Sequence, residues 1–362
     1  MTFPEGAEYD IKHKFMAFFD SLFRDIGIDL GTANSLIYVK GQGVIVNEPS
    51  VAAMNTKTNR ILAVGDEAKK MLGRTPSHIN VVRPLVNGVI SDYEMTEEML
   101  RHLLSRGKSN SFSSYRRAIL AIPDNLTEVE RKSVEDAALG AGCSKVYLVE
   151  SPVAAALGAG LPIAVPEANL IVDIGGGTTD IAVISMGGTV VSRTLKIAGD
   201  HFNDDITRFL RDEFQLAVGE ATAEYTKIAV GSAIPLDERL EIPVRGRDMA
   251  TGLPREVIIK NTHARVALSK SLRSIADAIH ETIEATPPEL AGDVLRHGIV
   301  LCGGGALLRG FGDLIERETG VPVTIAHDPL TCVVRGLGQM IDDFESHREL
   351  LDNPLRPLSV AL

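Results

Sequence analysis

The sequence predicts a two-lobed α/β fold with a duplicated core and a small insertion on each lobe. Two glycine-rich hairpins of one design lie 144 positions apart, as measured between Asp29 and Asp173. Strands alternate with helices after the first hairpin, which is typical of an α/β sheet. The length of 362 residues and the hydrophobic content of 44% allow about two domains with a large core.

The more glycine-rich hairpin covers residues 170–184. Two β-branched apolar runs flank its turn, as expected for paired strands. Gly175, Gly176 and Gly177 leave three consecutive backbone N–H groups unshielded, and such groups can cradle an anion. Asp173 ends the incoming strand, where a carboxylate can hold the hydrated Mg²⁺ that accompanies a phosphate.

A second copy of this pattern covers residues 26–39 and superposes Asp29 on Asp173 and Gly31 on Gly175. A single glycine-rich hairpin is often an ordinary turn, but two copies indicate half-domains that clamp one phosphate chain from both sides. Neither copy is a P-loop or a dinucleotide fingerprint, because each turn leads into a strand and no Gly-Lys-Ser/Thr follows.

The overall composition excludes several classes of protein. The formal net charge of −11 argues against a nucleic-acid binder, whose affinity comes mainly from neutralised phosphates. Three scattered cysteines are too few for a disulfide framework or a zinc knuckle, which fits a reducing cytoplasm. No apolar run approaches the roughly 18 residues of a spanning helix, and no cleavage site follows the N-terminal apolar patch. We therefore expect a cytoplasmic chain.

Residues 11–24, within an N-terminal segment 1–24, show the period of an amphipathic helix. Four of the eleven Phe residues of the chain lie there, which favours an interfacial membrane anchor. A helix docked on the core is the alternative, since nearby aspartates almost cancel the basic residues. The expected apolar face consists of Ile11, Phe15, Phe18, Phe19 and Leu22.

The first lobe is expected to cover residues 25–157 and 327–350, with an insertion at about 44–90. Ser91 with Glu94, and Thr127 with Glu130, predict capping boxes that start two helices. A polar loop is expected at 108–115; it is interpreted as an ordinary loop, and membrane contact through Phe112 is the alternative. The expected strands are 44–46, 51–54, 61–64, 118–122 and 145–149, and the expected helices are 67–72, 91–105 and 127–139.

The second lobe is expected to cover residues 158–326, with an insertion at about 199–260. A helix of small residues at 151–158 would connect the lobes and act as a hinge. The tail, residues 351–362, is expected to be disordered, beginning after Glu349. The expected helices of this lobe are 200–215, 220–230 and 264–285, and its expected strands outside the hairpin are 240–245, 256–260, 299–302 and 321–326. A last helix, 329–344, is expected to return to the first lobe.

A third glycine cluster, Gly303 to Gly305, lies between a predicted strand and a predicted helix. Bare backbone at a helix N-terminus favours anionic or polar ligand groups. A tight strand-to-helix turn without a ligand is the alternative interpretation.

Eight segments together resemble the MreB family of bacterial actin homologues, within the superfamily of actin, DnaK-type chaperones and sugar kinases. The resemblance covers about residues 25–345 and implies an actin-like, ribonuclease H-like fold. The segments are 29–34, 47–51, 72–76, 173–179, 219–224, 286–290, 303–310 and 328–331.

The resemblance also implies an ATP site. The two hairpin tips would hold the phosphates, while Asp29 and Asp173 would hold hydrated Mg²⁺. Glu224 and Lys227, one helical turn apart, would reach the ribose and base, although alone they would be taken for a surface pair. The implied ATP ligands are Thr32, Ala33, Asn34, Gly176, Gly177, Thr178, Glu224, Lys227, Gly304, Gly305, Ala306 and Leu307.

One position departs from the family. The family normally has a glutamate before the proline of the connecting helix, where it positions the attacking water, but this chain has Ser151, preceded by Glu150. Oriented general-base help is worth about 10²- to 10⁴-fold, so slow hydrolysis is expected unless Glu150 or a water bound by Ser151 substitutes. The expected catalytic group is thus Glu150, Ser151 and Thr178. Asp180, where Glu is more usual, is a milder change.

By this resemblance the chain is an ATP-binding, filament-forming cytoskeletal protein that organises cell-wall synthesis and rod shape. Its expected partners are further copies of itself in paired protofilaments, the inner face of the cell membrane, and the cell-wall elongation machinery. A small-molecule kinase and a DnaK-like ATPase are the alternatives. The first would need a further carboxylate base and the second a substrate domain, and the sequence offers neither.

Overall fold

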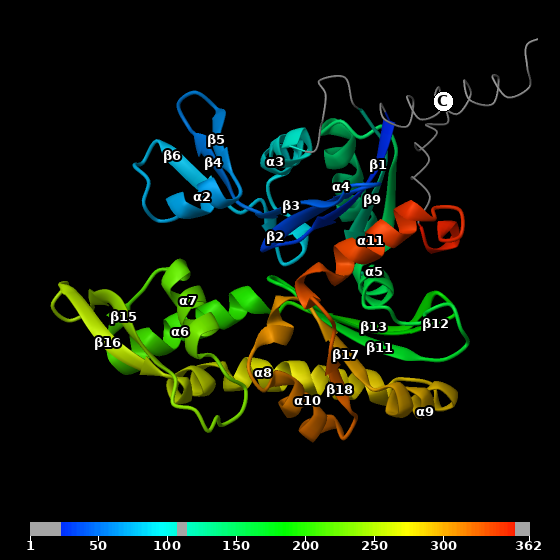
Figure 1. Cartoon of the computed structure of the whole chain (residues 1–362). Helices are drawn as coiled ribbons and strands as arrows, with labels where there is room; N and C mark the ends of the chain where they lie inside the picture. Colours follow the sequence, from blue (N-terminus) through cyan, green and yellow to red (C-terminus); the bar gives the residue numbers. More distant parts are fainter. Residues whose placement is uncertain (1–22, 107–113, 352–362) are drawn as a thin grey trace, which may run out of the picture.

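The computed structural model describes residues 23–106 and 114–351. Two lobes lie one above the other, each built on a five-stranded sheet (Figure 1). The sheet of lobe I has the order β10-β9-β1-β2-β3. Its strands are β1 (Phe23–Leu30), β2 (Asn34–Val39), β3 (Gly43–Pro49), β9 (Ser114–Ile122) and β10 (Val146–Glu150).

The sheet of lobe II repeats this topology as β18-β17-β11-β12-β13. In each sheet the first three strands of the lobe form an antiparallel meander, and the first of them also pairs in parallel with a later strand. The predicted duplication is therefore confirmed. The strands are β11 (Asn169–Ile174), β12 (Thr179–Ser185), β13 (Gly188–Leu195), β17 (Ile299–Cys302) and β18 (Val323–Ile325).

Each lobe carries a smaller sheet at the same side of the molecule (Figure 1). The expected insertion at 44–90 includes β3, which pairs with β2 in the main sheet. In lobe I the small sheet contains β4 (Ala52–Asn55), β5 (Arg60–Val64) and β6 (Ile79–Val82), with α2 (Asp66–Met71) beside it; in lobe II it contains β14 (Leu216–Ala217), β15 (Glu241–Asp248) and β16 (Pro254–Lys260).

Helices cover the outer faces of both sheets. Among the described residues, no helix is long and apolar enough to cross a membrane. Lobe I has α3 (Tyr93–Arg106) and α4 (Glu128–Gly140), together with the short hairpin β7 (Leu85–Val86) and β8 (Val89–Ile90); lobe II has α6 (Gly199–Phe214), α7 (Glu220–Val230), α8 (Asn261–Glu284), α9 (Pro288–His297) and α10 (Phe311–Thr319).

Two helices, α5 (Ser151–Gly158) and α11 (Cys332–Asp342), pack between the two sheets. Successive residues of β9 alternate between cores: Leu120 belongs to the core of lobe I, whereas Ile119 belongs to the core shared by α5 and α11. The helices cross at Gly158 and Gly336, where any Cβ would overlap the backbone of the other helix. Small residues in α5 therefore allow close helix contact, as predicted.

The ends of several predicted elements are wrong. Phe23 and Arg24 belong to β1, and Ser114 and Tyr115 belong to β9, because these two segments pair in parallel. The rest of the predicted anchor, and Phe112 in the loop, lie outside the described residues. Leu351 is buried against the core between the sheets, so the expected disorder does not begin at Glu349; residues 352–362 lie outside the described range.

Two predicted helix starts have different outcomes. The capping box of Thr127 and Glu130 is confirmed. The box predicted for Ser91 is wrong, because the Met95 N–H donates to Asp92 Oδ1 (3.0 Å) while the Ser91 hydroxyl donates to the Pro84 carbonyl (3.1 Å). An aspartate one position later thus supplies the N-cap.

Candidate functional site

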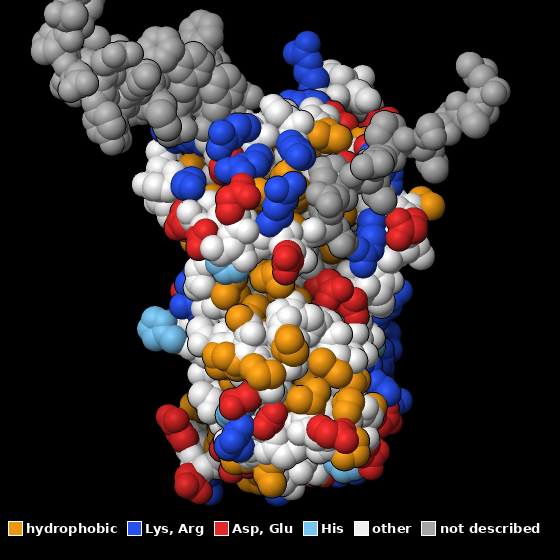
Figure 2. All heavy atoms as spheres, turned by 90° about the vertical axis from the view of Figure 1, so that its right-hand side faces the viewer, with side chains coloured by type: hydrophobic (Ala, Val, Ile, Leu, Met, Phe, Trp, Pro, Cys, Tyr) orange, Lys and Arg blue, Asp and Glu red, His pale blue; other side chains and the backbone are white. Residues whose placement is uncertain are grey.

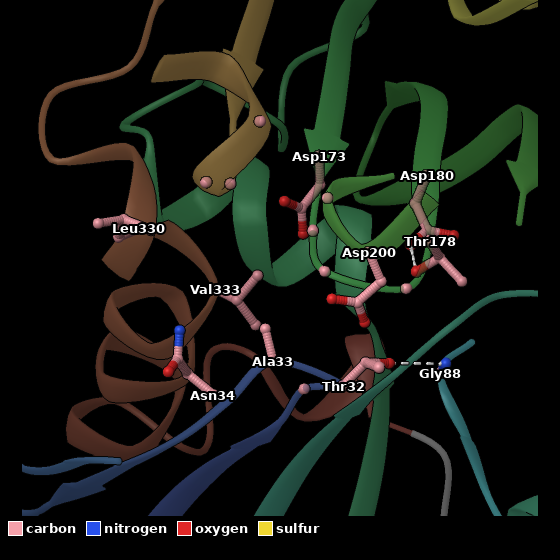
Figure 3. Close-up of a pocket in the computed structure, with 18 of the residues that line it drawn as sticks. Thr32, Ala33, Asn34, Gly88, Asp173, Thr178, Asp180, Asp200, Leu330 and Val333 are labelled. Carbon is pink, nitrogen blue, oxygen red and sulfur yellow. Dashed lines mark hydrogen bonds between the residues drawn. The ribbon is translucent and has the colours of Figure 1, made fainter. Parts of the chain in front are cut away.

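A cavity of about 590 Å³ lies between the lobes and is lined by both hairpin tips (Figure 3). Most of the sequence-predicted site residues meet there, although they come from distant parts of the chain. Glu150 and Ala306 are not among the lining residues. Those that line it are Asp29, Thr32, Ala33, Asn34, Ser151, Asp173, Gly176, Gly177, Thr178, Glu224, Lys227, Gly304, Gly305 and Leu307.

The two tips touch each other. A Cβ atom on Gly176 would lie 2.5 Å from Ala33 Cβ, and one on Gly177 would lie 2.5 Å from Thr32 Oγ1. Each turn is closed by a backbone hydrogen bond, such as that from the Gly175 N–H to the Thr178 carbonyl (2.9 Å). Glycine in the second tip therefore makes room for the side chains of the first.

Two half-buried carboxylates, Asp29 and Asp173, lie at the ends of the incoming strands. Burial raises the pKa of Asp29 from its ordinary 3.8 to about 7. The pKa of Asp173 rises to about 8, mainly through burial and then through the neighbouring charges of Asp180 and Asp29. A cation beside such a pair would favour the charged form of both carboxyl groups. A Mg²⁺ ion that keeps several waters needs one or two carboxylates, so these residues fit that ion.

Glu224 and Lys227 lie on α7 at the cavity but do not pair with each other. Glu224 Oε2 lies 2.9 Å from Lys69 Nζ on α2, which belongs to the other lobe. The Lys227 ammonium donates to the Gly199 carbonyl (2.8 Å), and burial lowers the pKa of Lys227. Both side chains therefore form contacts with elements that the sequence did not indicate.

The third glycine cluster packs against the second hairpin. Gly303 has a φ of 77°, and a Cβ there would overlap Asp173 Oδ1 and the Ile174 carbonyl. The cluster leads into a short 3₁₀ helix, η1 (Gly304–Leu307), and not into an α-helix, so the predicted α-helical N-terminus is wrong. Within η1, Ala306 is buried in the core of lobe II, whereas Leu307 lines the cavity and is 56% exposed.

Ser151 lines the cavity at the first turn of α5, whereas Glu150 has another partner. The Thr189 hydroxyl donates to Glu150 Oε2 (2.6 Å). The pKa of Glu150 is raised, chiefly by burial and also by the nearby charge of Asp124. The structure thus brings together two of the three expected catalytic residues, Ser151 and Thr178.

Several cavity residues were not predicted as site residues, and among them Gly88, Asp180 and Asp200 form contacts that bear on the site (Figure 3). The Gly88 N–H donates to Thr32 Oγ1 (3.0 Å), a contact over 56 positions that no local pattern could reveal. Asp200 lies in the first turn of α6, and an acid directly after a glycine at a helix start was an available signal. Arg83, from lobe I, approaches Asp200 at 3.5 Å and also pairs with Glu220.

Comparisons with known proteins agree with this arrangement. Residues 23–349 match the family described as MreB/Mbl protein. Cell shape-determining protein Mbl of Bacillus subtilis is 47% identical over 322 residues, which cover 89% of this chain and 97% of the relative. Cell shape-determining protein MreB of Escherichia coli K12 is 46% identical over 339 residues, which cover 92% of this chain and 97% of the relative.

Solved structures give the same result. MreB5 of Spiroplasma citri bound to ADP has a TM-score of 0.86 and 42% sequence identity, and the match covers 91% of this chain and 99% of that one. The MamK double helical filament, at 23% identity and a TM-score of 0.75, covers 88% and 98% and shares the fold. These relatives do not favour the kinase or chaperone alternatives. The chain therefore belongs to the MreB/Mbl family and has the two-lobed actin-like fold that its motifs predicted.

Proposed function

We propose that this chain binds ATP with Mg²⁺ between its lobes and assembles into cytoskeletal filaments that determine cell shape. The observation that carries the proposal is the contact of two matched hairpin tips at one cavity between the lobes. Two structures of MreB5 from Spiroplasma citri, 42% and 43% identical to this chain, are bound to ADP and AMPPNP respectively. The relatives named for cell shape determination support the cellular role.

The hairpin tips are suited to hold the phosphates from two sides. Gly176 and Gly177 present backbone N–H groups from lobe II, and Thr32 and Asn34 present polar side chains from lobe I. Asp29 and Asp173 would hold the Mg²⁺ ion, which neutralises phosphate charge when bound. Since the ligand contacts both lobes, its binding favours the closed arrangement.

The nucleoside would lie between α7 and η1. Glu224 offers a carboxylate to the ribose hydroxyls, while the exposed Leu307 offers apolar surface to the base. Glu224 would then share its oxygens between the ribose and Lys69, which lies 2.9 Å away.

Hydrolysis in this site is slow and is coupled to polymerisation. Ser151 can bind a water but cannot accept its proton at neutral pH, and Glu150 is engaged by Thr189 away from the cavity. ATP therefore persists in the site, and the closed subunit shape persists with it.

One end of the molecule has the surface that a subunit contact needs. Figure 2 shows the end opposite β4 and β15, where hydrophobic side chains gather over lobe II and Lys and Arg over lobe I. Exposed apolar surface of this kind is typical of interaction sites. Head-to-tail contact at this end would be heterologous, and such a contact extends into a filament where the rotation between subunits does not close a ring. Pairing of two such protofilaments is part of the proposal.

A sedimentation assay tests binding and assembly together. With ATP and Mg²⁺ the protein is expected to pellet above a critical concentration, whereas without nucleotide or with EDTA it stays in the supernatant. Nucleotide binding is measured in the same samples with a fluorescent ATP analogue. A protein that binds ATP but stays monomeric at high concentration would contradict the filament proposal.

The filament is further proposed to lie on the inner membrane face, where it organises the cell-wall elongation machinery. The amphipathic pattern of residues 11–24 supports this part. Co-sedimentation with anionic liposomes is expected for the full chain and not for a variant that starts at Asp25. Equal binding by both would exclude residues 11–24 as the anchor.

A further inference from the structure

Five carboxylates line the cavity, and four of them either would face the metal ion or lie beside a basic side chain. Asp29 and Asp173 would face the metal ion. Asp200 approaches Arg83 (3.5 Å), and Glu224 pairs with Lys69 (2.9 Å). The remaining carboxylate belongs to Asp180, which lies on β12 two residues after the second hairpin tip.

Asp180 is buried, and its carboxylate accepts hydrogen bonds from two hydroxyl groups. The Thr178 hydroxyl donates to Asp180 Oδ2 (3.0 Å), and the Thr194 hydroxyl donates to Asp180 Oδ1 (2.6 Å). Only 4% of the surface of Asp180 is exposed, so the surrounding protein fixes the position of its carboxylate. Figure 3 shows Thr178 and Asp180 side by side at the cavity, joined by the hydrogen bond between them.

This contact decides which way the Thr178 hydroxyl points. Because its hydrogen is directed to Asp180, the lone pairs of Thr178 Oγ1 remain available to accept a hydrogen bond. A water that donates to Thr178 Oγ1 has its own lone pair free to face a phosphate held by the same tip. Ser151, which lines the same cavity, offers a second hydroxyl for that water.

We infer that Asp180 is a positioning residue for ATP hydrolysis, which accepts the hydrogen of the Thr178 hydroxyl and so leaves the Oγ1 lone pairs to accept a hydrogen bond from the attacking water. The inference rests on the proposed function. This chain has Ser151 where the family normally has the glutamate that positions the attacking water. Because phosphoryl transfer depends more on the position of the water than on a strong base, water positioned by Thr178 could support hydrolysis here.

The reaction balances without a further reactant. The water oxygen forms a bond to the γ-phosphorus as the bond from that phosphorus to the bridging β,γ-oxygen breaks. ADP leaves with the electron pair of that bond, and the water's two protons pass to inorganic phosphate and to solvent. Asp180 remains a hydrogen-bond acceptor throughout.

Single-turnover hydrolysis by Asp180→Asn tests the inference, with ATP affinity measured in parallel. The amide can donate to Thr178 Oγ1 and so reverse the hydroxyl; hydrolysis is expected to fall about 10- to 100-fold while the ATP dissociation constant changes less than threefold. Asp180→Glu keeps an acceptor and is expected to recover much of the rate. Thr178→Val is expected to slow hydrolysis similarly, and the double variant no further.

Asp205→Asn provides a matched control. Asp205 is a buried aspartate of lobe II that accepts a hydrogen bond from the Ser271 hydroxyl and does not line the cavity. Any fall in hydrolysis by Asp205→Asn therefore measures the effect of general destabilisation. Wild-type hydrolysis by Asp180→Asn at normal ATP affinity would overturn the inference. The inference would also be overturned if Asp205→Asn slowed hydrolysis as much as Asp180→Asn does and Asp180→Glu did not recover the rate. If the wild type binds ATP and polymerises but does not hydrolyse it, this inference and the proposed hydrolysis both fail, while the proposed ATP binding and filament assembly stand.

Discussion

The two hairpin tips have the same topology, but they contribute different things to the cavity. The first tip presents the side chains of Thr32, Ala33 and Asn34, whereas the second presents almost bare backbone at Gly176 and Gly177. The space for a Cβ in the second tip is already filled by the first. Duplication thus preserved the fold, while divergence made the two copies complementary.

The tips are also held in place differently. The first is tied to the turn between β7 and β8 through a side chain, Thr32. The second is tied to the start of α6 through backbone alone, since the N–H groups of Gly199 and Asp200 donate to the carbonyls of Gly175 and Gly176 (3.1 and 2.8 Å). Side-chain substitutions should therefore affect the two tips unequally.

The largest effect is expected for Gly176→Ala. The new methyl group would lie 2.5 Å from Ala33 Cβ and force the tips apart. Overpacking of this kind costs about 1–3 kcal/mol, so ATP affinity should fall about 5- to 150-fold in an equilibrium titration. Ala33→Gly should bind ATP nearly normally, and the double variant should recover part of the affinity. Additive losses in the double variant would contradict direct contact between the tips.

The paired aspartates predict a pH dependence of the nucleotide-free protein. Asp29 and Asp173 have pKa values of about 7 and about 8 in the folded chain, against 3.8 as the ordinary value. The folded state therefore binds more protons than the unfolded chain between about pH 4 and 8, and the free energy of unfolding falls as pH rises through that window.

Thermal unfolding measured from pH 5 to pH 8.5 without nucleotide should show this loss as a melting temperature lower by several degrees at the alkaline end. Asp173→Asn should flatten the curve more than Asp29→Asn, because Asp173 has the more strongly raised pKa. A melting temperature that rises over this range in the wild type and both variants would contradict the assigned shifts.

A smaller effect is expected for Thr32→Val. The valine fills the same space but leaves the Gly88 N–H without its acceptor, which costs about 1–3 kcal/mol for a buried donor and less here because the site is partly exposed. Urea unfolding should report the loss, and Thr32→Ser should retain most of the stability. Equal stability of the valine and serine variants would show that the hydrogen bond does not hold the first tip.

The smallest effect is expected for Lys69→Met, which removes a contact between the lobes that does not involve the tips. The Lys69 and Glu224 side chains are 36% and 30% exposed, and such pairs contribute about 0.2–1 kcal/mol. ATP release should accelerate by less than about fivefold, and the difference from wild type should shrink at high salt. A change as large as that of Gly176→Ala would mean that this rim contact, and not the tips, holds the lobes together.

Local patterns predicted much of the fold. The hairpins, the capping box of Thr127 and the small-residue helix α5 depend on residues close in sequence, so their signals are visible in the sequence alone. The helix α9 is absent from the predicted elements, which have no helix directly after 264–285, although Pro288 occupies the first turn of α9.

Contacts over long sequence separations explain what could not be predicted at the site. The partners of Glu224 and Thr32 are 155 and 56 positions away, and neither has a sequence pattern of its own. The third glycine cluster was recognised, but glycine at 303 is required by close packing against Asp173 and not by a helix start. The contacts of these site residues thus depend on tertiary packing, which local sequence patterns do not reveal.

The crossing of α5 and α11 has a consequence for the shape of an assembled polymer. The chain passes between the lobes at these two helices, and Gly158 and Gly336 let their backbones meet. Since β4–β6 and β15–β16 lie far from this crossing (Figure 1), a slight rotation there displaces both small sheets by a much larger amount. Repeated in every subunit, that rotation would set the curvature of the whole filament.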